Sequence, residues 1–175
     1  IKAEDTETLN DQVWVEKGDG PAWLTGGTYM ISRRIRMRIE NWDRTTLLEQ
    51  ERVIGRQKGS GAPNGLTEEF EELNLDLADD KDTPLIDVDA HVRLASHQHL
   101  NGIRILRRGY NFTDGSDGFG HLDAGLFFLA YMRDPRTSFV PVQQRLARSD
   151  ALNEYLRHVG SALFAVPPGV QEGEH

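Results

Sequence analysis

The sequence predicts an α+β fold: an antiparallel sheet with helices on one face. In residues 34–39 arginines alternate with apolar side chains, as in a half-buried strand. Residues 125–132 form a continuous apolar run bounded by turn residues, which is typical of a buried strand. The predicted order is strand, helix, excursion, strand, strand, helix, helix, strand, and this alternation favours helices gathered on one side of the sheet.

Residues 1–25 form a leading segment before the first strand. Residues 1–10 are polar and acidic, so we expect them to be extended, and residues 12–15 form a short apolar run. A glycine-rich turn follows at residues 18–21. The strand begins at about Gly26 and opens the main domain, which we expect to cover residues 26–168, followed by a tail at residues 169–175.

The middle of the chain combines one predicted helix with a long irregular part. Residues 41–55 are expected to be helical, because three apolar side chains share one side and Gly55 stands where the helix would end. Residues 55–63 have a loop composition. Residues 66–82 contain eight acidic residues and one lysine, so we expect an acidic surface excursion with mobile parts and no bound metal.

The last third of the chain returns to regular structure. Residues 114–118 form a turn cluster, and apolar spacing predicts one helix at residues 139–146 and another at residues 152–159. A short final strand is expected at residues 161–166, because Pro167 and Pro168 would end it.

Composition excludes some classes of function. The net charge of −8 argues against nucleic-acid binding, which requires a basic surface. The chain has no cysteine, so neither a disulfide framework nor a thiolate metal site can be inferred. No run of 18 apolar residues occurs, so we expect no membrane span.

The most specific sequence motifs are two segments, Asp89-Ala-His-Val-Arg-Leu-Ala95 and Ile105-Leu-Arg-Arg-Gly-Tyr-Asn-Phe112. Together they resemble the haem-ligating region of the dye-decolourising (DyP-type) peroxidases, including their deferrochelatase/peroxidase branch. The resemblance extends from about Val13 to Pro168 and matches only the C-terminal half of such a protein. It implies a ferredoxin-like domain, the C-terminal half of a dimeric ferredoxin-like haem peroxidase, with residues 1–25 leading from an N-terminal ferredoxin-like domain.

The resemblance also implies the main site residues and haem b as the cofactor. His91 corresponds to the axial ligand of the haem iron, and we expect its second ring nitrogen to donate to a carboxylate or a backbone carbonyl. Arg107 corresponds to the distal arginine, the catalytic cation that stabilises charge as the peroxide bond breaks. The sequence does not indicate which group accepts the hydrogen bond from His91.

Further haem contacts follow from the same resemblance. Arg56 corresponds to a haem-contacting arginine, for which a propionate is the natural partner, and Lys58 could act similarly as a point charge. Ser96, His97 and Gln98 occupy the short haem-edge segment, where the family often has Asn-Pro-Arg. Either Phe127 or Phe128 would form a distal wall, and we select Phe127. His97 and His99 have a metal-like spacing but lack a third ligand, so we expect no metal there.

One requirement of peroxide chemistry has no candidate in the sequence. The proton carrier of the resembled family is an aspartate in a Gly-x-x-Asp-Gly motif, and residues 114–118 do not fit because Asp114 stands where glycine is needed. We therefore expect the motif to lie upstream, in an N-terminal half that is either cut from a precursor or a separate chain. A homo-oligomer is left open. Arg34, Arg36 and Arg38 face either solvent, a cofactor carboxylate or that other half.

The leading hypothesis is a haem peroxidase that uses H2O2 to oxidise dyes or other aromatic reductants together with its N-terminal half. Three alternatives remain open: a deferrochelatase that removes iron from haem, a haem-binding module without turnover, and a ferredoxin-like structural domain without haem. The resemblance also implies export by the twin-arginine route and hence an extracellular or periplasmic location.

Overall fold

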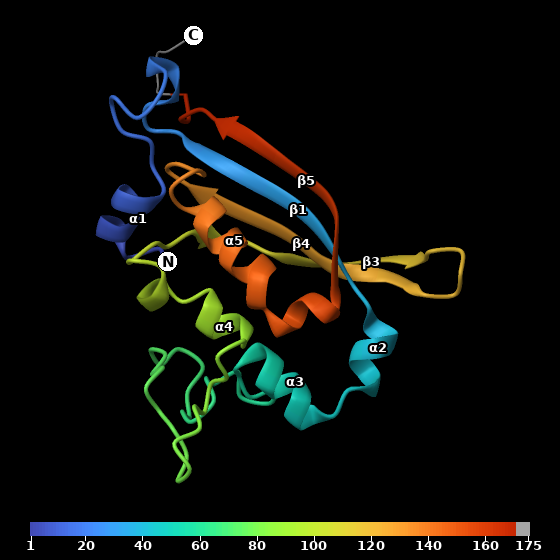
Figure 1. Cartoon of the computed structure of the whole chain (residues 1–175). Helices are drawn as coiled ribbons and strands as arrows, with labels where there is room; N and C mark the ends of the chain where they lie inside the picture. Colours follow the sequence, from blue (N-terminus) through green and yellow to red (C-terminus); the bar gives the residue numbers. More distant parts are fainter. Residues whose placement is uncertain (171–175) are drawn as a thin grey trace.

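The computed structural model describes residues 1–170, which form an antiparallel sheet with helices on one side (Figure 1). Strand β1 (Thr28–Met37) is central, between β4 (Leu122–Met132) and β5 (Leu156–Val166). The far side of β4 pairs with β2 (Leu106–Arg107) and with β3 (Tyr110–Ser116). The strand order is β2-β4-β1-β5.

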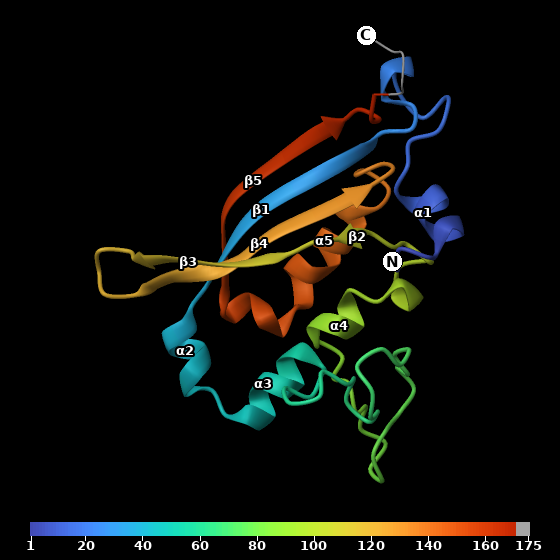
Figure 2. The same ribbon diagram turned by 180° about the vertical axis from the view of Figure 1, so that it is seen from behind.

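Helix α5 (Phe139–Ser149) lies across one face of the sheet, and α4 (His91–Leu94) and α3 (Leu47–Ile54) lie on the same side (Figure 1). The view from behind shows the strands with no helix in front of them (Figure 2). The remaining elements are short: α1 (Thr6–Gln12), α2 (Ile39–Arg44) and the 3-10 turns η1 (Ala22–Leu24), η2 (His97–His99) and η3 (Ala151–Glu154). This is the ferredoxin-like α+β arrangement predicted from the sequence, and the prediction is confirmed.

Strand register defines the two faces of the sheet. Ile31 is opposite Ala130, and both are buried with Met132 against Phe139 of α5. Partners in an antiparallel ladder point to the same side, and successive residues alternate between sides. Odd-numbered positions of β1 and even-numbered positions of β4 therefore face the helices.

Two predictions near the start of the chain need correction. The leading segment is not extended throughout, because Asp5 accepts a hydrogen bond from the Thr8 backbone and starts helix α1. The single helix expected at residues 41–55 is two helices, since Thr46 adopts an extended conformation and caps α3 through the Glu49 backbone. An N-cap residue has non-helical backbone angles, so one helix cannot continue through Thr46.

Two further corrections concern the C-terminal third. The helix expected at residues 152–159 is only the turn η3, and β5 begins at Leu156. The turn cluster at residues 114–118 extends β3 as far as Ser116, and the loop lies beyond it. The tail prediction falls mostly on residues 171–175, outside the described residues. No helix within residues 1–170 has the length and apolar character needed to cross a membrane.

Candidate functional site

His91 is the first residue of α4, a helix of only four residues on the helix-covered side of the molecule. Gly55 allows α4 to lie close to the end of α3. It has a left-handed φ of 84°, and a Cβ there would lie 2.5 Å from the Val92 side chain. Only glycine combines that backbone conformation with so small a volume. The sequence signal that ended the predicted helix thus also sets the position of the histidine.

The imidazole of His91 is held by a buried carboxylate. Its Nδ1 lies 2.7 Å from Oδ2 of Asp150, whose side chain is only 3% exposed. The other oxygen of Asp150 accepts the Leu152 backbone N–H at 2.9 Å. A carboxylate accepts only, so Nδ1 is the donor, and in the neutral imidazole Nε2 then has the lone pair. Neutral imidazole with a free Nε2 is the form that ligates a metal.

Arg107 faces the same side of the sheet. Its register partner in β4 is Ala130, which packs against the α5 side. Within residues 1–170, neither a hydrogen bond nor an ion pair is formed by its guanidinium. The side chain is exposed, yet surrounding protein lowers its pKa by desolvation, and Arg56 lowers the pKa further. Protein atoms around the guanidinium thus disfavour its charged form, although part of the side chain stays in contact with solvent.

Arg56 is near Arg107 but is already engaged through one nitrogen. Its Nη1 donates to the carbonyls of Gly61 and Glu69, at 2.7 and 2.9 Å. Lys58 turns away, because its ammonium donates to the Gln50 side chain at 2.9 Å. The charge of Arg56 thus acts on Arg107, whose pKa it lowers, while Lys58 is directed to α3.

The predicted haem-edge residues follow α4 directly, and each has a protein partner. Ser96 is buried and accepts the Gln98 backbone N–H, which starts η2. His97 Nε2 lies 2.5 Å from a nitrogen of Arg104. The Gln98 amide donates to the Leu73 carbonyl at 2.9 Å. Across residues 1–170, His97 and His99 belong to no group of ligands suited to a metal ion.

The choice of Phe127 as a distal wall residue needs correction. Phe127 is opposite Arg34 and Tyr110, on the face that carries no helix. Its neighbour Phe128 packs with the α5-side cluster and hence faces the side of His91 and Arg107. Adjacent strand residues point to opposite faces, so the two aromatic residues cannot both reach one site. We place Phe128 in the candidate site instead.

Asp150 was missed by the sequence analysis. It ends α5 and caps η3, 59 residues after His91. The only local signal was an acidic residue at a helix end, which usually indicates a cap. Nothing in that pattern distinguishes a cap from the acceptor of a histidine hydrogen bond.

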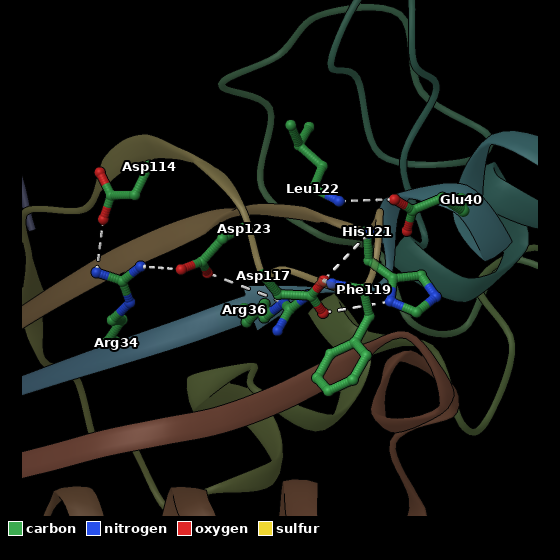
Figure 3. A network of polar contacts seen from close by, with 9 residues as sticks. All are labelled: Arg34, Arg36, Glu40, Asp114, Asp117, Phe119, His121, Leu122 and Asp123. Atoms are coloured by element: carbon green, nitrogen blue, oxygen red, sulfur yellow. Dashed lines mark hydrogen bonds and ion pairs between the residues drawn. The ribbon is translucent and has the colours of Figure 1, made fainter.

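Two of the strand arginines, Arg34 and Arg36, belong to a separate network at the turn end of the β3–β4 hairpin (Figure 3). Arg34 pairs with Asp114 at 2.7 Å and with Asp123 at 2.9 Å. Arg36 pairs with Asp117 at 2.6 Å, and Asp117 also lies 3.2 Å from His121 Nδ1. These arginines therefore hold the hairpin, on the face opposite to Arg107.

The residues present fit a flat, dianionic, iron-containing cofactor such as haem. His91 offers a neutral nitrogen ligand, and Arg107 is a cation without a protein counter-charge in the described part. An arginine without a protein counter-charge suits a carboxylate group of such a cofactor.

Comparison with known proteins agrees with this geometry. The family model described as Dyp-type peroxidase, C-terminal, matches residues 2–171. A dye-decolorizing peroxidase from Thermobifida fusca (strain YX) is 44% identical over 176 residues, which cover 99% of this chain and 41% of the relative. A deferrochelatase from Yersinia pestis bv. Antiqua (strain Nepal516) is 41% identical over 177 residues, covering 99% of this chain and 40% of the relative.

A solved structure gives the same result. Ferric DtpA from Streptomyces lividans superposes with a TM-score of 0.92 at 38% identity, covering 99% of this chain and 47% of that chain. The chain thus spans less than half the length of these relatives.

Proposed function

The chain belongs to the Dyp-type peroxidase family, and from this premise we propose that it forms the haem-binding half of a haem b peroxidase. The observation that carries the proposal is the His91–Asp150 pair at 2.7 Å. It fixes the tautomer that leaves Nε2 free to bind iron on the side that Arg107 also faces. The similar Streptomyces lividans protein was solved in a ferric state, which supports an iron cofactor here.

In this proposal each residue has a defined role. Bound haem supplies the redox chemistry by which H2O2 is reduced at the expense of an aromatic donor such as a dye. His91 holds the iron through Nε2, and Asp150 keeps the proton on Nδ1 and makes the imidazole a stronger ligand. Arg107 stabilises negative charge on the peroxide oxygens as they separate. Phe128 excludes water from that side.

The proton carrier is proposed to come from the part of the relatives that this chain does not cover. Peroxide chemistry needs a group that moves the peroxide proton to the leaving oxygen. To act on peroxide beside Arg107, that group must reach the helix-covered side of the sheet, which Arg107 faces.

The proposal is tested by substituting the histidine in the full-length protein that contains this chain. His91→Ala should abolish the Soret band of the purified holoprotein, because the iron loses its protein ligand. His121→Ala is the matched control, since His121 also contacts an aspartate but lies in the hairpin. An unchanged Soret band in His91→Ala would overturn the assignment.

Deferrochelation is the second candidate, because a relative at 41% identity carries that name. The same residues would hold haem, so the two activities differ in product. Incubation of the holoprotein with excess haem and an iron chelator distinguishes them. Metal-free protoporphyrin, seen by its fluorescence, indicates iron removal, whereas dye bleaching with H2O2 indicates peroxidase activity.

We also propose export by the twin-arginine route, on the strength of the resemblance in residues 105–112 alone. A precursor with a twin-arginine leader, and its accumulation in the cytoplasm when that leader is changed, would test this. Full export of a leader-free precursor would contradict it.

A further inference from the structure

We propose that Arg93 is a positioning residue: it ties α4 to the irregular segment 73–86 and thereby fixes the orientation of His91. The inference rests on the proposed function, in which His91 holds iron. It gives a role to the acidic excursion, for which the sequence analysis had predicted only a solvated surface.

The need for such a residue follows from the size of α4. The helix has four residues, His91–Leu94, and its N-cap residue Ala90 makes no side-chain capping bond. One helical turn fixes several backbone angles for a single hydrogen bond and is unstable alone. The direction of the His91 ring must therefore be set by contacts outside the helix.

Asp150 contacts the His91 ring itself, and Arg93 supplies polar contacts that hold the helix. Its Nη1 donates to the carbonyls of Leu75 and Ile86, at 2.9 and 3.1 Å. Both of these residues are buried, and together with Ala90 they form one apolar cluster. A charged donor to two carbonyls in an apolar surrounding makes a strong contact, and removing it leaves both acceptors without that donor. Within residues 1–170, Arg93 forms no ion pair with a carboxylate.

The excursion has little internal structure to hold it. Between residues 66 and 86 the only ladder contact is an isolated bridge between Ala78 and Pro84. Side chains from the site region supply anchors instead: Arg56 donates to Glu69, Arg93 to Leu75, and Gln98 to Leu73. Of these three side chains, only that of Arg93 belongs to α4, where it lies two residues from His91. Its two bonds therefore link the position of α4, and with it that of His91, to the position of the excursion.

The expected consequence is spectroscopic. If α4 is less firmly held, the His91 ring is less well aligned with Asp150, and the Nδ1–H bond to the carboxylate weakens. A weaker bond makes the imidazole a poorer donor to iron. The ferrous iron–histidine stretching frequency should fall, the midpoint potential should rise, and haem should dissociate faster.

The experiment uses the full-length holoprotein and the variants Arg93→Gln and Arg93→Lys, with Arg133→Gln as control. Arg133 also donates to two residues, Glu16 and Asp19, but these lie at the exposed surface. Resonance Raman of the ferrous protein gives the stretching frequency, and transfer of haem to apomyoglobin gives the dissociation rate. We expect Arg93→Gln to lower the frequency and to accelerate haem loss about tenfold or more, as for other groups that orient a metal ligand. Arg93→Lys should recover part of the effect.

Gln98→Ala keeps the test decisive if Arg93→Gln does not fold. Its amide makes a more exposed contact to the same segment, so the variant should fold and shift the frequency in the same direction by less. The iron–histidine mode could be present in wild type and lost in His91→Ala, yet unchanged in the folded Arg93 and Gln98 variants. That result would overturn this inference but not the proposed function. Absence of that mode in wild type would instead overturn the proposed function.

Discussion

Two regions of the molecule contain the same three residue types, and they use them in opposite ways. In the candidate site these are His91, Asp150 and Arg107; at the hairpin they are His121, Asp117 and Arg36. The hairpin aspartate contacts both of its partners, Arg36 at 2.6 Å and His121 at 3.2 Å (Figure 3). Asp150 contacts His91 alone among these charged side chains, at 2.7 Å, and Arg107 is left without a carboxylate in the described residues.

The difference shows what makes the first set suited to chemistry. At the hairpin, the charge on Asp117 is neutralised by Arg36, and the His121 side chain is 59% exposed. At the site, the buried carboxylate accepts from the imidazole and from the Leu152 backbone N–H and contacts no arginine, so it orients the His91 ring. The arginine keeps its positive charge available for a ligand. Charged groups that are paired with one another hold parts of the fold together, whereas a charge without a counter-charge in the described residues is available to a ligand.

The largest expected effect comes from the two arginines. In the full-length holoprotein, Arg107→Leu should slow the reaction with H2O2 by about 10²–10³, the usual cost of removing one preorganised donor. Arg36→Leu should leave that rate unchanged, because this guanidinium is already paired on the other face. Stopped-flow absorbance at increasing peroxide concentration measures both. Equal rates for wild type and Arg107→Leu would remove the distinction drawn here.

The two aspartates give the next effect. Asp150→Asn keeps the shape of the side chain but removes its charge, so it should weaken haem retention by about 10–100-fold, as for other partners of metal-ligating histidines. Asp117→Asn should not change haem retention. Haem transfer to apomyoglobin from the two holoproteins measures this. If both variants lose haem at the wild-type rate, the carboxylate partner of His91 has no part in haem binding.

The sequence predicted the fold better than it predicted the register within it. The two strands with clear patterns lie in the centre of the sheet as β1 and β4, although the alternation at residues 34–39 runs past the end of β1 at Met37, and Ile39 already belongs to α2. The choice between Phe127 and Phe128 failed because alternate residues of a strand point to opposite faces of the sheet. In a continuous apolar run, nothing in the sequence shows which residues point to which face. The helix expected at residues 152–159 failed for a related reason. Four apolar positions fit a helical stripe, but pairing with β1 makes the segment a strand from Leu156.

The sequence predicted only those site residues that lie in the segments resembling the family. His91 and Arg107 lie in two segments that carry the family resemblance, and the structure brings them to one side of the sheet. Asp150 lies 59 residues from its partner, and no local pattern links the two. The acidic excursion was predicted from charge alone, because composition does not reveal which of its carbonyls accept bonds from Arg93 and Gln98.

The smallest expected effect is a local pH dependence of the hairpin. Hydrogen bonds from Arg36, Phe119 and His121 lower the pKa of Asp117 well below its ordinary value of 3.8, with the Arg36 contact first among the causes. A carboxyl group whose pKa is lower in the folded state stabilises that state above the ordinary value, and this contribution is lost as the pH falls through the lowered pKa. The hairpin should therefore stay ordered at pH 4 and above, and loosen only in stronger acid.

Amide NMR shifts of Phe119 and His121, whose N–H groups donate to Asp117, report this directly. The Ile31 amide in the centre of the sheet is the internal control for general unfolding. In Asp117→Asn the two hairpin amides should lose this titration. If in wild type they titrated at or above pH 3.8, the Arg36–Asp117 pair would contribute nothing to holding the hairpin.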